Sequence, residues 1–282
     1  MFGISTGLGR YPYRLLNAFR EARAARRAPF GAGKFETRPP SAANAIDIFA
    51  GRWATDLSKF DPQWHGGGVD LKDDQRPLLA ARHLGAADRL DGMSVIELGP
   101  LEGIHTWLLA KLGARRIVAI ESNVEAYLKC LIVKELLDLK QAHFLLGDFN
   151  PYLERTDERF DLAFCAGVLY HMEDPLSMIR DLARIADRCF VWTHYYDPAN
   201  YHGAERKRTP VTVDGFAATY FRADYSDRAQ PVFWGGNKPS NSWMTQAEIL
   251  AAFRHYGFGR VEIVQAEPTH PHGASFCFVA AR

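Results

Sequence analysis

From residue 93 onward, apolar segments of strand length alternate with amphipathic segments of helix length. The strand-like segments lie near 93–98, 115–120, 142–147, 161–166 and 188–194, and the helix-like segments lie near 103–112, 122–138 and 173–186. The short connections between them are typical of right-handed parallel crossovers. A final helix near 245–256 and two strand-like runs, 261–266 and 275–280, complete the pattern. It predicts an α/β fold with a doubly wound, mostly parallel seven-stranded sheet.

Two segments precede this alternating region. Residues 1–43 are expected to form a basic N-terminal helix, over about 11–27, that ends at Pro29, and a linker over 31–43. Residues 44–92 are expected to form a helical lead-in, with helices at about 44–57 and 73–84 and a glycine loop at 66–68. We therefore place the main domain at 93–282.

A long polar and aromatic interval, residues 197–242, follows the fifth predicted strand. Loops of this length are usually functional or contain small elements of their own. After the fifth strand the interval can cover the carboxyl ends of the strands, where open α/β sheets bind ligands. We interpret it as a substrate cap whose aromatic residues suit a ring-bearing or glycan-like acceptor. The candidate substrate-binding residues in it and at its borders are Tyr196, Arg222, Trp234 and Trp243.

Composition and charge narrow the class of protein. The chain has 282 residues, 47% of them hydrophobic and 24% charged, which is typical of a globular protein without a membrane span. The N-terminus has no continuous apolar region of the kind found in secretion signals. The four cysteines are far apart, so we expect buried, reduced thiols and a cytoplasmic protein.

The net charge of +1 is unevenly distributed. Residues 1–40 contain eight Lys or Arg against Glu21 and Glu36, which makes this segment +6 and the remainder −5. A basic helix over residues 10–27 can contact nucleic acid or an anionic membrane surface. The alternative is a solvated helix whose apolar residues dock on the domain. The overall balance does not require an RNA substrate.

Candidate chemistry gathers where the predicted strands end. The first strand runs into a glycine turn, Glu97-Leu98-Gly99-Pro100-Leu101-Glu102-Gly103. Glu121 ends the second strand, where a carboxylate can accept hydrogen bonds from both hydroxyls of a ribose or can cap the next helix. Asp148 and Phe149 follow the third strand, where an aspartate can bind an adenine amino group or form a turn. The fourth strand ends in Ala166-Gly167 and leads into Val168-Leu169-Tyr170-His171.

These elements together resemble the class I S-adenosylmethionine-dependent methyltransferases over residues 93–195. The resemblance implies a Rossmann-like fold and a pocket for S-adenosylmethionine. By position, Glu97, Gly99 and Gly103 match the motif that lines the methionine part, Glu121 the ribose acid and Asp148 with Phe149 the adenine element. Leu101 stands where the family commonly has another glycine, and Glu102 either faces the cofactor or begins the helix. The candidate cofactor-binding residues are Glu97, Gly99, Pro100, Leu101, Gly103, Glu121, Ser122, Asp148, Phe149, Ala166 and Gly167.

The candidate catalytic residues are His171, His194 and Tyr170. His171 follows the fourth strand, and an imidazole can remove a proton from a hydroxyl acceptor near neutral pH. The alternative for His171 is a structural role. His194 ends the fifth strand, and Tyr170 is expected to line the donor pocket. The histidine spacings do not indicate a metal site.

A narrower similarity connects Gly167–His171, Asn241–Thr245 and Tyr256–Phe258 with bacterial tRNA wobble-uridine carboxymethyltransferases. It implies a second possible reaction, carboxymethyl transfer to tRNA from carboxy-S-adenosylmethionine. The basic Lys-Gly-Pro-Phe segment of those enzymes has no counterpart here. We therefore expect methyl transfer to a small-molecule or saccharide- or lipid-linked acceptor. A third possibility is a non-catalytic cofactor-binding scaffold.

Overall fold

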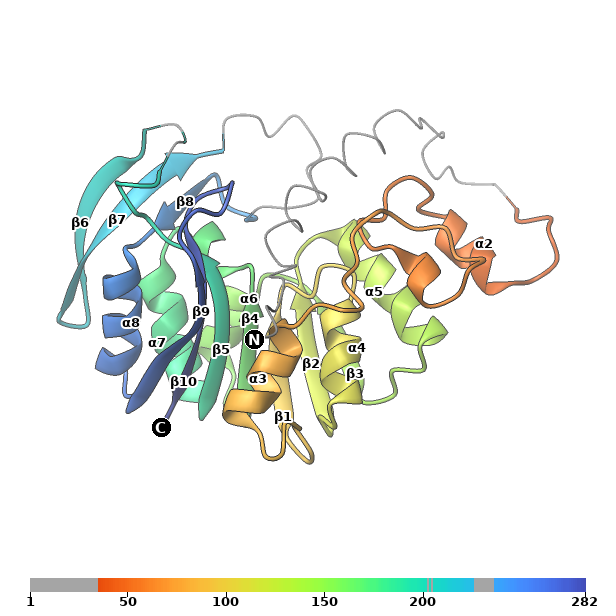
Figure 1. Cartoon of the computed structure of the whole chain (residues 1–282), viewed down its shortest axis with the longest axis horizontal. Coiled ribbons are helices and arrows are strands. Elements are labelled where there is room, and N and C mark those ends of the chain that lie inside the picture. The colour runs from red at the N-terminus through yellow and green to blue at the C-terminus, as the bar shows by residue number, and fades with distance from the viewer. Residues whose placement is uncertain (1–34, 202, 204, 226–235) are drawn as a thin grey trace, which may run out of the picture.

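The computed structural model describes residues 35–201, 203, 205–225 and 236–282. Its main sheet has seven strands in the order β3-β2-β1-β4-β5-β10-β9 (Figure 1). β1 to β5 are parallel, and β10 runs antiparallel to both of its neighbours. The predicted doubly wound, mostly parallel seven-stranded sheet is therefore confirmed. The strands are β1 (Ser94–Leu98), β2 (Arg116–Glu121), β3 (Ala142–Leu146), β4 (Leu162–Ala166), β5 (Arg188–His194), β9 (Arg260–Glu267) and β10 (Ser275–Ala281).

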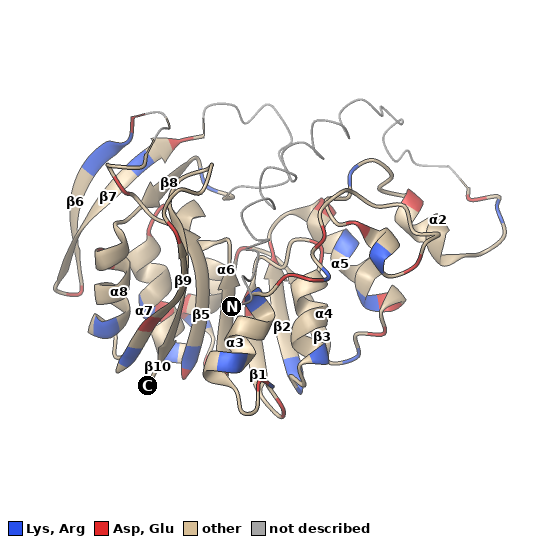
Figure 2. Ribbon diagram, in the orientation of Figure 1, with Lys and Arg blue, Asp and Glu red and all other residues tan. Residues whose placement is uncertain are grey.

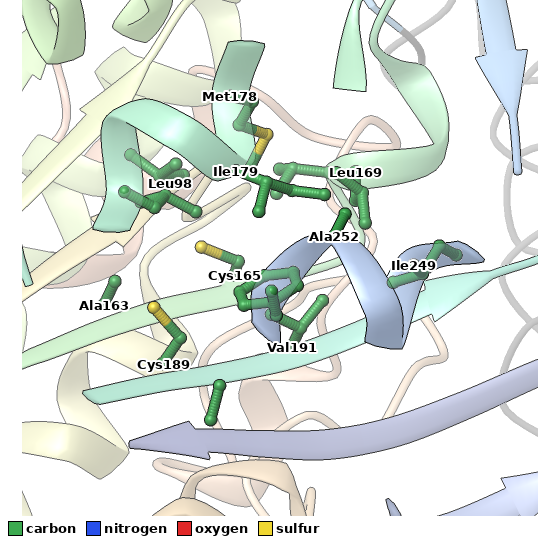
Figure 3. Packing of buried hydrophobic residues seen from close by; sticks show 14 of the residues in the cluster. Leu98, Ala163, Cys165, Leu169, Met178, Ile179, Cys189, Val191, Ile249 and Ala252 are labelled. Carbon is green, nitrogen blue, oxygen red and sulfur yellow. The ribbon is translucent and has the colours of Figure 1, made fainter. Parts of the chain in front are cut away.

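Helices cover both faces of this sheet. On one face, Cys165 of β4 and Val191 of β5 pack with Ile179 and Ala252 in a buried cluster (Figure 3). Ile179 belongs to α7 (Pro175–Ile185) and Ala252 to α8 (Gln246–His255). A second buried cluster joins the other face to α3 (Arg76–Leu84), α4 (Ile104–Lys111) and α5 (Val124–Leu136). Each face of the sheet thus has its own apolar core.

The lead-in shares the second core with the sheet. Trp53, Leu57 and Leu90 are buried in the same cluster as Val95 and Phe164. Its elements are α2 (Ala42–Asp47), the 3₁₀ helix η2 (Leu57–Lys59) and α3. Our expectation of one helix over 44–57 was wrong, because α2 ends at Asp47. The backbone amides of Ala54 and Thr55 instead donate to the Glu102 carboxylate, at 2.9 Å each.

Glu102 fastens this lead-in to the main domain. Its carboxylate is fully buried and also accepts a hydrogen bond from Lys129 Nζ of α5 at 3.1 Å. Lys129 is likewise buried, donates to the Arg52 carbonyl and lies over the Trp53 ring. Glu102 does not line the cavity, and it directly precedes Gly103, the N-cap of α4; its carboxylate joins three segments of chain.

The cap forms a separate antiparallel sheet in the order β6-β7-β8. Its strands are β6 (Lys207–Val213), β7 (Phe216–Asp224) and β8 (Ser240–Trp243). β6 and β7 are joined at Asp214-Gly215, where both residues have positive φ, 49° and 79°. This is the dihedral pattern of a tight hairpin turn, and Asp-Gly between alternating residues is its usual sequence signal. The sequence reading overlooked this signal.

Two sets of contacts hold the cap on the main domain. The Tyr220 hydroxyl of β7 donates to Asp174 at 2.6 Å, directly before α7, and accepts from the Leu176 amide. The Ser242 amide of β8 donates to the Met172 carbonyl at 2.7 Å. The cap is therefore attached to the same loop that carries Tyr170 and His171.

A short helix was also missed. α6 (Phe149–Arg155) follows β3, with Asp148 as its N-cap and Pro151 within its first turn, where proline is tolerated. All four cysteines are buried and unpaired, as the sequence indicated. In the described part of the chain, no helix has the length and apolar character of a membrane span. The helix expected over 11–27 and the candidate residue Trp234 lie outside the described residues.

Candidate functional site

A cavity of about 470 Å³ opens where the carboxyl ends of β1, β2, β4 and β5 meet the cap. This is the position at which open α/β sheets bind ligands. Most of the candidate cofactor-binding residues line it, together with Tyr170, His171, His194 and Trp243. The candidates from the donor half that line it are Gly99, Pro100, Leu101, Glu121, Ser122, Asp148, Phe149, Ala166 and Gly167.

The glycine turn after β1 forms one wall of this cavity. Gly99 has φ of 64°, and a Cβ at this position would lie 2.7 Å from the side chain of Val168. Only glycine fits there without displacing the loop after β4. Leu101 adopts φ of 60°, and its amide donates to Glu121 Oε2 at 3.2 Å. The turn therefore runs alongside the carboxylate at the end of β2.

Glu121 presents its carboxylate to the cavity from the end of β2. It is largely buried and accepts the Asn123 amide at 2.8 Å as well as the Leu101 amide. Burial raises its pKa, and these amides oppose that rise. The side chain that caps α5 is Asn123, which accepts from the Ala126 amide. Asn123, and not Glu121, is therefore the N-cap of α5, and Glu121 lines the cavity.

Glu97 and Gly103 lie behind the wall instead of in it. Glu97 is buried in β1 and accepts a 2.5 Å hydrogen bond from Thr106 Oγ1 of α4. Burial raises its pKa to about 8. Gly103 begins α4 in a left-handed conformation, with φ of 81°. The structure therefore gives both residues a part in shaping the turn, and cofactor contact stays a prediction for them.

The two carboxylate oxygens of Asp148 have different partners, the N-terminus of a helix and a lysine. Oδ1 accepts the Asn150 amide at 2.9 Å as the N-cap of α6, and Oδ2 lies 3.2 Å from Lys238 Nζ. Burial acts to raise its pKa, but the Asn150 amide, Asn237 and Lys238 together lower it. The turn role that we weighed for Asp148 is thus present, and the residue also lines the cavity.

Gly167 marks the junction between the donor half of the cavity and the half beneath the cap. Its φ is 96°, and a Cβ there would lie 3.4 Å from the Trp192 ring and 3.8 Å from the Tyr170 hydroxyl. Tyr170 contacts His194 with ring centroids 4.7 Å apart and Trp243 at 6.2 Å. Burial raises the pKa of Tyr170 above its usual range, so the phenol stays protonated at neutral pH. Tyr170 therefore lines the cavity as a neutral group, and its contact with a donor stays a prediction.

His171 is held by the cap. Its Nδ1 lies 2.8 Å from the Tyr225 hydroxyl, which also accepts the Gly236 amide at 3.1 Å. A hydroxyl that accepts this amide can donate its own proton to Nδ1, and Nε2 then carries the His171 proton. Burial, with His194 and Arg206 nearby, lowers the pKa of His171 to about 3. The geometry favours the structural alternative for this histidine.

His194 has a better-defined tautomer. Its Nδ1 lies 2.8 Å from the Gly273 carbonyl, which can only accept, so Nδ1 carries the proton and Nε2 has the lone pair. Its ring stacks on Trp243 at 5.5 Å and contacts His270 at 4.8 Å. Burial lowers its pKa to about 4, so the ring is neutral at pH 7.

A buried charge cluster that the sequence reading missed lies beside Trp192. Asp74 binds the Arg76 guanidinium through several hydrogen bonds, and its Oδ2 lies 3.2 Å from His105 Nε2. Arg76 lies over the Trp192 ring, 4.8 Å from its centroid, and lines the cavity. Burial acts to raise the pKa of Asp74, but Arg76 and His105 hold it well below its usual range. No local sequence motif relates these residues to Trp192.

Two further wall residues were not among the candidates. Arg206 of the cap lies 4.1 Å from the centroid of the Trp243 ring. His270, between β9 and β10, accepts the His272 amide at Nδ1, and its buried Nε2 has no hydrogen-bond partner among the described residues. Arg206 lies in the basic run Glu205-Arg206-Lys207-Arg208 and His270 in His270-Pro271-His272, but neither stretch by itself indicates the cavity.

Two of the four substrate candidates, Tyr196 and Arg222, lie apart from the cavity wall. Tyr196 stacks on Phe221, with centroids 3.7 Å apart, and Arg222 is exposed on β7. Of the four, Trp243 is the one that lines the cavity among the described residues. Within the same residues, no group of three or more His, Cys, Asp or Glu is arranged to hold a metal ion.

Comparison with known sequences bears on this site. A family model described as a methyltransferase domain matches residues 89–195. A tRNA U34 carboxymethyltransferase of Campylobacter hominis is 31% identical over 93 residues, 33% of this chain and 32% of that protein. Its counterpart from Campylobacter curvus is 27% identical over 162 residues, 53% of this chain and 52% of that protein. The chain thus spans between a third and a half of the length of these relatives.

Known structures share the fold. The N-terminal domain of EvdMO1, solved with SAH and D-fucose, is 24% identical with a TM-score of 0.58, over 78% of this chain and 86% of that one. An S-adenosylmethionine-dependent methyltransferase from Clostridium acetobutylicum is 10% identical with a TM-score of 0.51, over 80% and 94%. The strand order, the position of the cavity and the matching family model agree with one another. Residues 89–195 of this chain therefore match a methyltransferase domain, and the chain shares its fold with these solved methyltransferase structures.

Proposed function

We propose that this chain is an S-adenosylmethionine-dependent methyltransferase whose acceptor is a ring-bearing small molecule or a saccharide- or lipid-linked precursor. The observation that carries the proposal is one continuous cavity, lined on one side by the strand-end residues of the donor half and on the other by aromatic and imidazole rings. A methyl transferase needs this arrangement, because donor and acceptor must meet in line within one water-poor space.

The donor half suits the cofactor in shape and charge. The turn at Gly99 leaves room for close approach of a ligand to the backbone, and the Glu121 carboxylate faces the cavity beside it. Glu121 would accept the ribose hydroxyls, and Asp148 with Phe149 would hold the adenine ring. When bound, the cofactor supplies an electrophilic methyl group on a sulfonium. Its positive charge suits a wall that carries Glu121 and Asp148.

The acceptor half consists of flat rings. Tyr170, Trp192, His194 and Trp243 contact one another edge to face or stacked. Such surfaces bind planar rings and the apolar faces of sugars. The D-fucose in the structure of EvdMO1, which shares only the fold, makes sugars a sensible class to include in an acceptor screen.

His194 is the better of the two histidine bases for an oxygen acceptor. Its proton is fixed on Nδ1 by the Gly273 carbonyl, whereas Tyr225 contacts Nδ1 of His171. With a pKa of about 4, His194 accepts a proton only as the acceptor oxygen bonds to the methyl group and its own proton becomes acidic. We expect His194→Gln to lose methyl transfer while binding S-adenosylhomocysteine normally, as measured by product formation and calorimetry. His171→Gln is the comparison and should retain more activity.

Calorimetry with S-adenosylmethionine and S-adenosylhomocysteine tests the central proposal. We expect dissociation constants in the micromolar range, about −8 kcal/mol of binding free energy. If neither compound binds in that range, the chain is not a methyltransferase of this kind.

Glu121→Ala tests the donor half directly. Losing hydrogen bonds to a charged acceptor should weaken S-adenosylhomocysteine binding by about 1–3 kcal/mol. Glu135→Ala, at an exposed position near the end of α5, is the matched control and should not change the dissociation constant. An unchanged constant for Glu121→Ala would refute its ribose role.

Carboxymethyl transfer to tRNA is the second candidate, favoured by the sequence relatives. The Arg206 guanidinium lines the cavity and can pair with a carboxylated donor, whereas the Arg76 guanidinium is already paired with Asp74. Mass spectrometry of the nucleoside that copurifies with the protein separates the two reactions. Carboxy-S-adenosylmethionine would favour tRNA modification, and the plain donor or its product would favour methyl transfer.

A non-catalytic scaffold is the third candidate, and the basic segment 1–40 is its motivation. Removing residues 1–40 and measuring binding to RNA and to anionic vesicles tests whether that segment has a partner. The four buried, unpaired cysteines support a reducing compartment such as the cytoplasm.

A further inference from the structure

We propose that the acceptor half of the cavity receives an anionic oxygen group, a carboxylate or a phosphate, and that Arg206 binds it. This inference rests on the proposed methyl transfer and narrows the class of acceptor. Two guanidinium groups line the cavity, and among the described residues Arg76 has a carboxylate partner whereas Arg206 has none.

Arg206 has neutral partners only. Its Nε donates to the Tyr201 hydroxyl at 3.1 Å, and its Nη1 donates to the Phe221 carbonyl at 3.1 Å and to Asn241 Oδ1 at 2.7 Å. Among the described residues, no carboxylate forms an ion pair with it and no acceptor is bonded to Nη2. The two protons of Nη2 are therefore left for a ligand.

Arg76 provides the contrast within the same wall. Its charge is neutralised by the buried carboxylate of Asp74, and this pair is complete in the structure. Arg206 is also partly withdrawn from water, and burial lowers its pKa. Taking a cation out of water without a counter-ion costs free energy, which an anionic ligand would recover.

The surroundings of Arg206 also fix its direction. Its guanidinium stacks on the Trp243 ring at 4.1 Å and is oriented by the Asn241 side chain of β8. A stacked, hydrogen-bonded guanidinium presents its remaining donors in a fixed plane, which suits the bidentate geometry of a carboxylate or phosphate. The residue is thus prepared for recognition, unlike an arginine on a solvated face.

His270 supplies a second, independent observation. The His272 amide donates to its Nδ1, and burial lowers its pKa to about 3, so the neutral ring carries its proton on Nε2. This Nε2 is buried without a partner among the described residues, and His270 is 5% exposed and lines the cavity. An unsatisfied buried donor costs about 1–3 kcal/mol, so an oxygen acceptor from the ligand is expected there.

One carboxylate, Glu267, also lines the cavity. Burial raises its pKa, and it forms no ion pair with Arg206. Glu267 is the last residue of β9, and its backbone carbonyl accepts the His270 amide at 3.3 Å. Among the described residues no ion pair joins Glu267 to Arg206, which precedes β6 of the cap, so Glu267 does not neutralise the guanidinium.

The test uses small probes that share a phenyl ring and differ in the charge of their oxygen group. Benzoate, phenyl phosphate and benzyl alcohol are titrated into the full chain with saturating S-adenosylhomocysteine, and tryptophan fluorescence from Trp192 and Trp243 reports binding. We expect at least one of the two anions to bind ten times more tightly than benzyl alcohol, and the better anion identifies the group as carboxylate or phosphate. Equal binding of all three probes would overturn the inference.

Variants locate the effect. Arg206→Gln should abolish the preference for anions, Arg206→Lys should retain part of it, and the exposed Arg222→Gln on the same sheet should leave it intact. A preference that survives in Arg206→Gln contradicts the assignment. If Arg206→Gln does not fold, two measurements still test the inference. They are the preference of the wild type for anions over benzyl alcohol and the smaller preference expected for Arg206→Lys.

Two other outcomes are distinguishable. Failure of S-adenosylhomocysteine to bind would remove the proposed function itself. If S-adenosylhomocysteine binds but Arg206→Gln weakens only carboxy-S-adenosylmethionine and leaves benzoate and phenyl phosphate unaffected, the arginine serves the donor and the inference about the acceptor is wrong.

Discussion

Leu101 is a non-glycine residue in the left-handed region of backbone conformation, with φ of 60°. An L-amino acid with a Cβ loses roughly 1–2 kcal/mol there. The surroundings compensate for this, because its amide donates to Glu121 and its carbonyl accepts the Cys130 thiol at 3.4 Å. Its side chain also packs on the buried cluster around α4 and α5. Leu101, which stands where a glycine is common, therefore forms a strained turn that hydrogen bonds and packing stabilise.

A pair of substitutions separates the strain from the packing. Leu101→Ala and Leu101→Gly both remove the side-chain contacts, but only glycine relieves the left-handed strain. We expect the glycine variant to be more stable than the alanine variant by about 1 kcal/mol in urea denaturation. An alanine variant equal to or more stable than the glycine variant would show that the turn is not strained.

Residues that follow strand ends could be predicted from the sequence, and residues from distant segments could not. Glu121 and Asp148 stand directly after apolar runs, and parallel strands bring their carboxyl ends to one edge. Arg76, Arg206 and His270 reach the same cavity from a helix, the cap and a loop between antiparallel strands. Their positions depend on how whole elements pack, and a local pattern does not contain that information.

Among the elements, length and periodicity predicted the regular strands and helices well. β5 was expected and found at 188–194, and α8 was expected at 245–256 and found at Gln246–His255. The errors have local causes. α6 has only seven residues, which is too short for a clear helical period, and the β6–β7 hairpin lay in a stretch that we took as irregular.

The buried contact between Glu102 and α5 makes a prediction about the lead-in. Glu102→Gln keeps the shape of the side chain but removes the charge opposite Lys129, so we expect a loss of about 3 kcal/mol in the free energy of unfolding. Glu125→Gln removes a partly exposed partner of the same lysine and should cost less than about 1 kcal/mol. Denaturation of both variants measures this, and equal effects would contradict the anchoring role of Glu102.

Across the described residues, acidic and basic residues both occur on helices, strands and loops (Figure 2). Local pairs such as Arg116 with Glu158 and Arg159 with Asp187 account for many of them. Pairs of this kind reduce the local charge of the described residues. This agrees with the balanced charge that the sequence indicated.

The buried histidines of the cavity affect the stability of the whole molecule at acid pH. The pKa of His194 is about 4 in the folded chain and 6.5 by its ordinary value. Between these values the unfolded chain binds a proton that the folded chain does not, so stability is lost as pH falls from about 6.5 toward 4. His194→Gln should flatten the dependence of unfolding free energy on pH by up to about 1.4 kcal/mol per pH unit.

Urea denaturation at several pH values between 4 and 7 measures that slope. The exposed His65→Gln is the control and should follow the wild type. If the slopes of His194→Gln and wild type coincide, the imidazole of His194 is not kept neutral by its surroundings.

The two ends of the cap meet on the main domain. The Tyr196 amide, just before the cap, donates to the Met244 carbonyl, just after it, at 2.8 Å. An insertion whose ends are adjacent can be exchanged as a unit, because the host fold needs only one short gap to be bridged. If the chain transfers methyl groups as proposed, exchanging this one segment would change the acceptor and leave the donor half unaltered. Transferring residues 197–242 of this chain into another class I methyltransferase domain would show whether this segment determines the choice of acceptor.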